Sequence, residues 1–323
     1  MHSFTLVVVI LAIIIPLVFA PSFLGHYYLS VLRTILMWAA LTMSWYFFSG
    51  LTRYISLGSS VFFGAGLYFT VLYLNFSIIE GRWPLLPFPA IVLIAGLLNF
   101  GFASILGLIT LRLRGIYFAI TTFALGMTCQ GIFDCLAANV MNAYYARSPS
   151  FAPQMKYYSM LATALVISLM IFTLSRSKLG TALKLAGRNE EAAVYLGLNV
   201  MRVKTLGFAI SATCMSFVGS SYAIISPIAD SKIAFYLKCS LLPPIMAIFG
   251  GIGTSYGPII GAVLLSLLNE YVGVAMTYYF LIIFGVVAIV IAKIVPEGIV
   301  GLMKKLVAKF FDGKRQGSIE EKS

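Results

Sequence analysis

Residues 85–111 read LLPFPAIVLIAGLLNFGFASILGLITL, a stretch without a charged side chain. A helix crosses the hydrocarbon core of a bilayer with about 20 apolar residues, and this stretch exceeds that length. The rest of the chain has the same character, because 61% of its 323 residues are hydrophobic and 10% are charged. Soluble domains contain about 25% charged residues. The composition leaves no room for a soluble catalytic domain and excludes most enzymes.

The sequence contains ten apolar runs, which we predict to be membrane spans. They are Phe4–Ala20, Leu29–Phe48, Ile55–Leu74, Leu85–Leu111, Ile116–Ala137, Tyr157–Leu174, Leu206–Ser226, Leu241–Gly250, Tyr256–Tyr271 and Tyr278–Ile294. The first run lacks the Lys and Arg of a signal-peptide n-region and is followed by Pro21, so we interpret it as a retained span. The predicted fold class is all-α: a polytopic integral membrane protein with about ten transmembrane helices, located in the cell membrane.

The short run that begins at Leu241 is the least regular of the ten. It opens with Pro243-Pro244 and ends in Gly250-Gly251, a pattern that also fits a half-helix or a re-entrant segment. With this run re-entrant and the first run interfacial, the chain has eight spans. Both counts stay open on the sequence alone.

Basic residues are dispersed among the apolar runs. The net charge is +12, but this dispersion indicates orientation in a membrane rather than binding to nucleic acid. With both termini in the cytoplasm, 16 of the 22 Lys and Arg residues lie on the inner side and six on the outer side. Cytoplasmic loops carry the excess of positive charge, so both termini are predicted to be cytoplasmic.

The chain divides into a transmembrane domain, residues 1–295, and a basic tail, residues 296–323. The transmembrane domain includes a polar cytoplasmic loop, residues 175–204. In the tail, Ile299, Met303, Leu306 and Phe310 share one helical face with lysines nearby. This pattern predicts an amphipathic helix on the surface of an anionic bilayer.

Side chains for catalysis or metal binding are scarce. The chain has two histidines, His2 and His26. Its cysteines, which lack metal-ligand spacing, are Cys129, Cys135, Cys214 and Cys239. We therefore predict no catalytic residue, no metal site and no enzyme activity in this chain.

Three ionisable residues, Arg33, Asp134 and Glu270, fall inside the apolar runs. Each lies near the end of a span, where its side chain reaches the interface. A carboxylate inside a membrane also marks ion pathways. An ion-coupled secondary transporter or a channel, with Asp134 or Glu270 as the coupling carboxylate, is therefore the alternative function.

Two segments rich in small residues lie near the cytoplasmic ends of spans in the two halves of the chain. Their candidate residues are Gly58, Ser59, Ser60, Gly64, Gly250, Gly251, Gly253, Gly257, Pro258 and Gly261. The second segment lacks the preceding strand and the Lys-Ser/Thr of a phosphate-binding loop. Both segments fit close helix packing, or a translocation pathway lined by backbone dipoles.

The polar loop contains a short predicted helix within residues 187–199, GRNEEAAVYLGLN. Asn189 suits the N-cap, Glu190 and Glu191 suit the positive end of the helix dipole, and Gly197 suits the residue that ends the helix. Ala193 and Leu196 share a small apolar face. A helix this short is marginal alone, so we expect it to pack on its own bundle or on a cytoplasmic partner.

Several stretches resemble one transporter family. Glu191-Ala192-Ala193 followed by Gly197 matches the EAA…G loop of ABC-importer permeases. Residues 111–119, LRLRGIYFA, resemble the branched-chain amino-acid permeases of high-affinity ABC importers, and further matches lie at 55–66, 207–212, 249–262 and 296–298. The resemblance covers roughly residues 35–302.

The resemblance implies a membrane subunit of an ATP-driven importer for branched-chain or other hydrophobic amino acids. Its partners would be a second, homologous permease in a heterodimer, two cytoplasmic ATPase subunits and an extracytoplasmic solute-binding protein. This chain would hold no cofactor, because ATP and Mg²⁺ would bind to the ATPase subunits. The residues implied to couple to the ATPase are Arg188, Asn189, Glu190, Glu191, Ala192, Ala193 and Gly197.

The outer segment 138–156, where a binding protein would dock, departs from the family pattern. Residues 139–149 read NVMNAYYARSP in place of a Thr-Gly-Gly-rich stretch. The wider family also handles urea, short amides and sugars, which stay open as alternative solutes.

Overall fold

A computed structural model of the chain describes residues 15–79, 81, 83–84, 86–140, 146–147, 151–226, 228–229, 231–275, 285–286 and 298–302. Most of the first predicted span, nearly all of the tenth and the tail beyond Leu302 lie outside these residues. Among the described residues, seven helical segments are long and apolar enough to cross a membrane. The prediction of an all-α, polytopic membrane protein is confirmed.

The helices follow one another with short connections. The elements are α2 (His26–Trp45), the π-helical turn η1 (Tyr46–Gly50), α3 (Ser59–Leu74), the π-helical turn η2 (Asn75–Ile79), α4 (Phe88–Thr110), α5 (Ile116–Val140), β1 (Ala146–Arg147), α6 (Pro153–Arg176), α7 (Lys178–Arg188), α8 (Glu190–Tyr195), α9 (Val200–Ile225), β2 (Ile228–Ala229), α10 (Ser231–Ala234), α11 (Leu237–Gly250) and α12 (Gly257–Ala275). Residues 15–23 are also helical.

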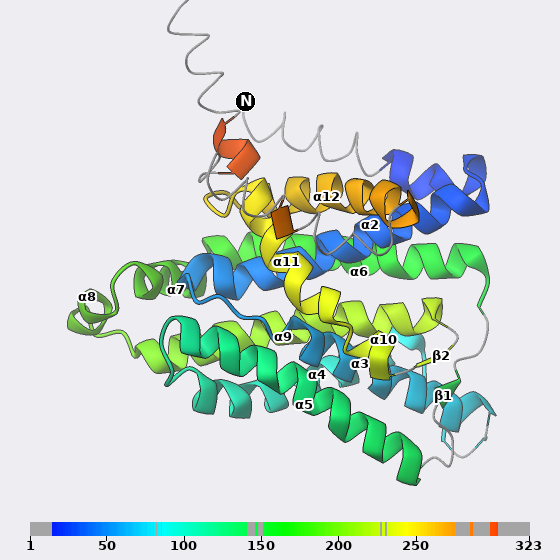
Figure 1. The fold of residues 1–323 in the computed structure, drawn as a ribbon, viewed down its shortest axis with the longest axis horizontal. Helices are drawn as coiled ribbons and strands as arrows, with labels where there is room; N and C mark the ends of the chain where they lie inside the picture. The colour runs from blue at the N-terminus through cyan, green and yellow to red at the C-terminus, as the bar shows by residue number, and fades with distance from the viewer. Residues whose placement is uncertain are drawn as a thin grey trace, which may run out of the picture.

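The long helices form a bundle with two distinct ends (Figure 1). Helices α7 and α8 lie at one end, here named the α8 end. The two-residue strands β1 and β2 lie at the opposite end, where Ala146 pairs with Ala229 in an antiparallel register. Because successive long helices run back and forth between these ends, segments distant in sequence meet at each end.

Helix α9 packs closely against α3 because small residues face each other across the contact. A Cβ atom on Gly219 would lie 2.0 Å from the Phe63 carbonyl oxygen, and one on Gly66 would lie 2.4 Å from the Ser216 carbonyl oxygen. Only glycine allows backbones to approach this closely. These contacts place α3 and α9 together within the largest buried apolar cluster of the described residues.

The run at Leu241 is longer in the structure than its apolar core indicated. Helix α11 begins at Leu237 and continues through Pro243 and Pro244. The short helix α10 precedes it, and the chain leaves the helical conformation at Phe235 and Tyr236. Residues Lys232–Gly250 therefore form a discontinuous helical segment that is long and apolar enough for a membrane span. The alternative of a half-helix or re-entrant segment stays a prediction.

Candidate functional site

The α7–α8 segment is a pair of capped helices joined at Asn189. Helix α7 ends at Arg188, and Asn189 takes an extended conformation that separates it from α8. The Asn189 side-chain oxygen accepts a hydrogen bond of 3.1 Å from the Ala192 amide. The N-cap predicted from the sequence is confirmed.

Gly197 ends α8 in the left-handed conformation, with φ +79°. The Gly197 amide donates to the Val194 carbonyl at 2.9 Å, and the Leu198 amide donates to the Ala193 carbonyl at 3.1 Å. This pair of bonds is a Schellman motif. A residue with a Cβ atom is strained at this φ, so the left-handed turn explains why position 197 is a glycine.

The two faces of α8 differ in exposure. Ala193 is fully buried, at 0% exposed. Val194, Tyr195 and Leu196 are 59%, 90% and 70% exposed and form an apolar tip, here named the α8 tip. Leu196 does not share the buried face of Ala193, because the helix ends at Tyr195 and Leu196 already belongs to the terminating turn. Glu191, which begins the EAA pattern, is exposed, as is Arg188.

Helix α7 is held against the last helical residues that follow η1, just before the loop that leads to α3. A Cβ atom on Gly187 would lie 2.5 Å from the Leu51 carbonyl oxygen and 2.7 Å from the Thr52 Cα atom. On its other side, Leu183 is fully buried and contacts Gly207 of α9. The α7–α8 pair is therefore packed on the bundle at two points.

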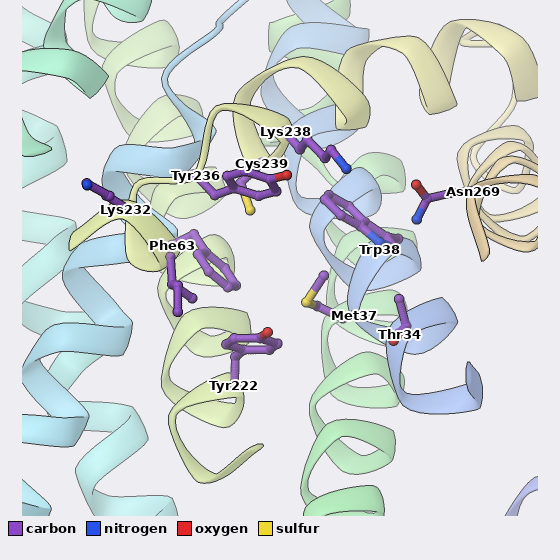
Figure 2. Close-up of a pocket in the computed structure, with 11 residues that line it drawn as sticks. Thr34, Met37, Trp38, Phe63, Tyr222, Lys232, Tyr236, Lys238, Cys239 and Asn269 are labelled. Atoms are coloured by element: carbon purple, nitrogen blue, oxygen red, sulfur yellow. The ribbon is translucent and has the colours of Figure 1, made fainter. Parts of the chain in front are cut away.

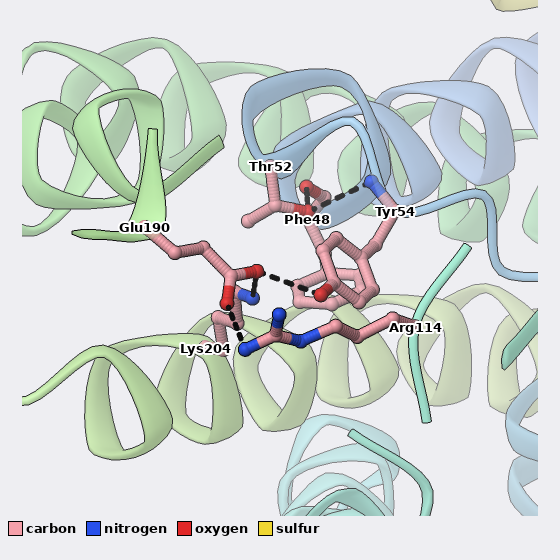
Figure 3. A network of polar contacts seen from close by, with 6 residues as sticks. All are labelled: Phe48, Thr52, Tyr54, Arg114, Glu190 and Lys204. Atoms are coloured by element: carbon pink, nitrogen blue, oxygen red, sulfur yellow. Dashed lines mark hydrogen bonds and ion pairs between the residues drawn. The ribbon is translucent and has the colours of Figure 1, made fainter. Parts of the chain in front are cut away.

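The Glu190 carboxylate, at the start of α8, points inward to a polar cluster (Figure 3). Its Oε1 atom accepts a hydrogen bond of 2.7 Å from the Tyr54 hydroxyl and also forms an ion pair with the Lys204 ammonium. Its Oε2 atom lies 3.5 Å from the Arg114 guanidinium. The Lys204 ammonium also lies 3.9 Å from the centre of the Tyr54 ring. We name Tyr54, Arg114, Glu190 and Lys204 the Glu190 cluster.

The Glu190 cluster joins four separate parts of the chain. Tyr54 belongs to the loop after α2, Arg114 to the loop before α5, and Lys204 to the first turns of α9. The Lys204 side chain is 3% exposed, so its charge is stabilised mainly by the Glu190 carboxylate and the Tyr54 ring. The LRLRGIYFA stretch contributes Arg114 and also Phe118, whose ring centre lies 5.6 Å from that of Tyr54.

The cluster shifts the pKa values of two of its members outside the spans. Burial alone raises the pKa of Glu190, but hydrogen bonds from Lys204 and Tyr54, together with the Lys204 and Arg114 charges, outweigh it and lower the pKa below its usual 4.5. Burial and the neighbouring Glu190 carboxylate raise the pKa of the Tyr54 hydroxyl to about 12. At neutral pH the cluster therefore holds an ionised Glu190 and a neutral Tyr54.

Sequence reasoning placed Glu190 in the coupling segment but missed its three partners. Two signals pointed to them: Lys204 is a cation next to an apolar run, and Arg114 lies in the LRLRGIYFA stretch. The roles predicted for Arg188 to Ala193 and for Gly197 in contacting an ATPase stay predictions.

The small-residue candidates in the first half of the chain lie at helix contacts. The Ser240 hydroxyl donates to the Ser60 hydroxyl at 2.7 Å. A Cβ atom on Gly64 would lie 2.6 Å from the Phe235 ring, and one on Gly58 would lie 3.2 Å from the Thr122 carbonyl oxygen. Ser59 is buried. These contacts favour helix packing, and a role in a pathway stays a prediction.

The small-residue candidates in the second half bring α11 and α12 together. A Cβ atom on Gly261 would lie 2.0 Å from the Met246 carbonyl oxygen, and one on Gly250 would lie 1.9 Å from the Gly257 carbonyl oxygen. Gly251 and Pro258 are buried. Gly253 faces open space, so it is the exception to this packing.

The ionisable residues inside the predicted spans and the cysteines lie outside the Glu190 cluster. Asp134 is exposed on α5, Glu270 is half-buried on α12, and Arg33 donates to Ser30 at 3.0 Å. All four cysteines are free thiols. In the part of the chain that the structure describes, no group of three His, Cys, Asp or Glu side chains is placed to hold a metal ion.

The fold and the site define a polytopic helical membrane protein that projects a rigidly held helix from one end of its bundle. Residues 27–292 match the family described as the permease component of branched-chain amino acid transport systems. The chain belongs to this family of multi-pass transport permeases, as the sequence resemblance predicted.

Two named relatives are similar to the chain. The chain is 25% identical over 300 residues to the high-affinity branched-chain amino acid transport system permease protein LivM of Salmonella typhimurium, covering 83% of this chain and 68% of the relative. It is 26% identical over 253 residues to LivM of Escherichia coli, covering 68% of this chain and 58% of the relative. No solved structure matches the chain.

Proposed function

We propose that this chain is a membrane subunit of an ATP-driven importer for branched-chain or similar hydrophobic amino acids. Its partners in this proposal are a second, homologous permease, two cytoplasmic ATPase subunits that bind ATP and Mg²⁺, and an extracytoplasmic solute-binding protein. Membership of the family supports the solute class. The names of the LivM relatives support the same class.

The single observation that carries the coupling role is the α8 tip on its tethered base. Val194, Tyr195 and Leu196 are exposed beyond the bundle, where a partner subunit gains apolar contact area. The Glu190 cluster ties the base of the same helix to α9 and to the loops beside α2 and α5. A displacement of α8 would therefore move these segments with it, rather than bend a loose loop.

The test is solute uptake by the assembled transporter in proteoliposomes. We expect uptake of labelled leucine that requires the binding protein and hydrolysable ATP on the ATPase side, and that persists when ion gradients are collapsed. Vesicles that lack the ATPase subunits are the control and should show no uptake. Uptake that follows a sodium or proton gradient without ATP would overturn the proposal in favour of a secondary transporter.

A further inference from the structure

Helix α6 has one exposed stripe along its length, and this stripe ends in a cation. Its exposed residues recur every three or four positions and therefore share one face. They are Ala162, Val166, Leu169, Thr173 and Arg176, here named the α6 stripe. Val166 and Leu169 are 57% and 67% exposed, and the Thr173 hydroxyl donates to the Leu169 carbonyl of its own helix at 3.0 Å. The stripe carries no charged side chain before Arg176, as expected of a surface that contacts acyl chains.

The lower part of the α6 stripe matches the depth of one leaflet of a bilayer. From Val166 to Arg176 the helix advances by ten residues, which is about 15 Å. The hydrocarbon core of a bilayer is about 30 Å thick, so one leaflet contributes about 15 Å. An acyl chain that lies along Val166 and Leu169 would therefore bring the headgroup of its lipid to the level of Arg176.

A second cation, Lys178, lies beside Arg176 at the bend between α6 and α7. The two residues are two positions apart, so their Cα atoms lie within about 7 Å of each other. Both are exposed, and we name them the bend cations. The bend is tight, because a Cβ atom on Gly180 would lie 2.4 Å from the Leu174 carbonyl oxygen. The Arg176 side chain turns back along α6, where its Cζ atom lies 3.9 Å from the centre of the Phe172 ring.

Within the described part of the chain, neither bend cation has a carboxylate partner. Residues 135–189 contain no Asp or Glu, and the next carboxylate, Glu190, is paired with Lys204 and Arg114. Lys184, another cation at this bend, donates to the Ser175 carbonyl at 3.2 Å. The bend cations therefore leave a positive surface at the end of an apolar stripe, and its complement is an anionic group that carries an apolar chain.

We propose that the bend cations and the α6 stripe form a binding site for one anionic phospholipid, whose phosphate pairs with Arg176 and Lys178 and whose acyl chain lies along α6. Basic residues at the membrane surface attract anionic headgroups, and a guanidinium donates two parallel hydrogen bonds to a phosphate. Helix α7 lies between the end of α6 and α8 (Figure 1). A bound lipid would therefore hold the base of the α7–α8 pair at the membrane surface. The inference goes beyond the proposed function, because the lipid site requires a membrane and no ATP-driven step.

The test is native mass spectrometry of the purified, delipidated full chain in detergent during a titration with phosphatidylglycerol. The first bound lipid should show at least about fivefold higher affinity for phosphatidylglycerol than for phosphatidylcholine with the same acyl chains. The double variant Arg176→Gln/Lys178→Gln should bind phosphatidylglycerol about tenfold more weakly. Arg176→Lys/Lys178→Arg keeps both charges and should retain most of the affinity, which separates the loss of charge from misfolding.

The matched control is Arg112→Gln/Arg202→Gln, which removes two exposed cations from the loop before α5 and from α9. It should bind phosphatidylglycerol within about twofold of the wild type. Glycerol 3-phosphate, which has the phosphate but no acyl chain, should not displace the lipid. Equal affinity for the two lipids, or equal losses in the two glutamine double variants, would overturn the inference. Unchanged lipid binding in Arg176→Gln/Lys178→Gln, with loss of an ATPase subunit from the assembled transporter, would overturn it in favour of a subunit contact.

Discussion

At the scale of single residues, the Glu190 carboxylate is the junction between α8 and the bundle. It contacts Tyr54, Arg114 and Lys204, which lie in three other segments. Lys204 is almost fully buried, and a buried cation without an anion is strongly destabilising. The stability of the α8 end therefore depends on one carboxylate.

We predict that Glu190→Gln lowers the free energy of unfolding by about 2 kcal/mol, below the usual cost of a broken buried pair because Glu190 is partly exposed. The measurement is unfolding of the purified chain in detergent micelles. Glu191→Gln is the matched control, since Glu191 is the exposed neighbour, and should change stability by less than about 0.5 kcal/mol. Equal stability of the two variants would contradict the assignment.

The lowered pKa of Glu190 predicts a specific dependence of this stability on pH. A carboxyl whose pKa is depressed by folding stabilises the fold above its unfolded pKa, here 4.5, and loses that contribution as the pH falls through its folded pKa. Tyr54, with its pKa raised to about 12, stays neutral over this range. The difference in unfolding midpoint between wild type and Glu190→Gln should be constant from about pH 8 to pH 5 and should shrink below about pH 4. A difference that persists at low pH would show that the ionised carboxylate is not responsible.

At the scale of elements, α8 depends on its terminating turn. We predict that Gly197→Val strains the left-handed backbone conformation at this position by about 1–2 kcal/mol. Helix α8 then loses its fixed end, and the α8 tip loses its orientation. In the assembled transporter, uptake should fall by about tenfold or more relative to ATP hydrolysis, because one order of magnitude corresponds to about 1.4 kcal/mol.

Gly81→Val is the matched control for this prediction. Gly81 also has a positive φ, +64°, and a Cβ atom added to it would have no heavy atom within 4 Å, but it lies in the loop before α4. The control carries the same backbone strain away from α8 and should keep uptake and hydrolysis coupled. Normal coupling in Gly197→Val would contradict the role of α8 as a lever.

Local elements were predictable from the sequence, and contacts between distant segments were not. The start and end of α8 follow from Asn189 and Gly197, because capping depends on residues within one turn. The Glu190 partners Tyr54, Lys204 and Arg114 lie 136, 14 and 76 positions away in the chain. The periodicity of apolar residues carries no information on which loops meet. The prediction that Leu196 shares a face with Ala193 was wrong for a related reason. The direction of the Leu196 side chain depends on the residue at which the helix ends, which is Tyr195.

The position of the break in the discontinuous helix α10–α11 was also not predictable from the local sequence. Pro243 and Pro244 suggested a break inside the Leu241 run, because proline removes a backbone donor. The structure instead places the break at Phe235 and Tyr236 and keeps the helix continuous through both prolines. The ring of Phe235 packs where Gly64 of α3 leaves space, so a tertiary contact accompanies the break.

At the scale of the whole molecule, two helices connect the Glu190 cluster to a cavity beside the α10–α11 break (Figure 2). Helix α9 carries Lys204 near its start and Tyr222 near its end, and α2 carries Met37 and leads into the loop of Tyr54. A force on α8 would therefore act on helices that also line this cavity.

This connection is useful for import only if the α8 end faces the cytoplasm, where ATP is available. The excess of Lys and Arg in the predicted inner loops supports that orientation. Thr181 on α7 and Gln154 at the start of α6 are both exposed and lie toward opposite ends of the bundle. In the experiment, each of these residues is replaced by cysteine in a chain that carries Cys135→Ser. This background removes the exposed native thiol, and the other three native cysteines are buried.

A membrane-impermeant maleimide should label Gln154→Cys in intact cells and Thr181→Cys only in inverted membrane vesicles. Both variants should react after solubilisation in detergent, which controls for intrinsic thiol reactivity. Labelling of Thr181→Cys from outside would place α8 on the wrong side for an ATPase, and the Glu190 cluster would then be a structural tie alone. The predicted pattern instead places the α8 tip in the cytoplasm and the end of the bundle that carries the start of α6 outside (Figure 1).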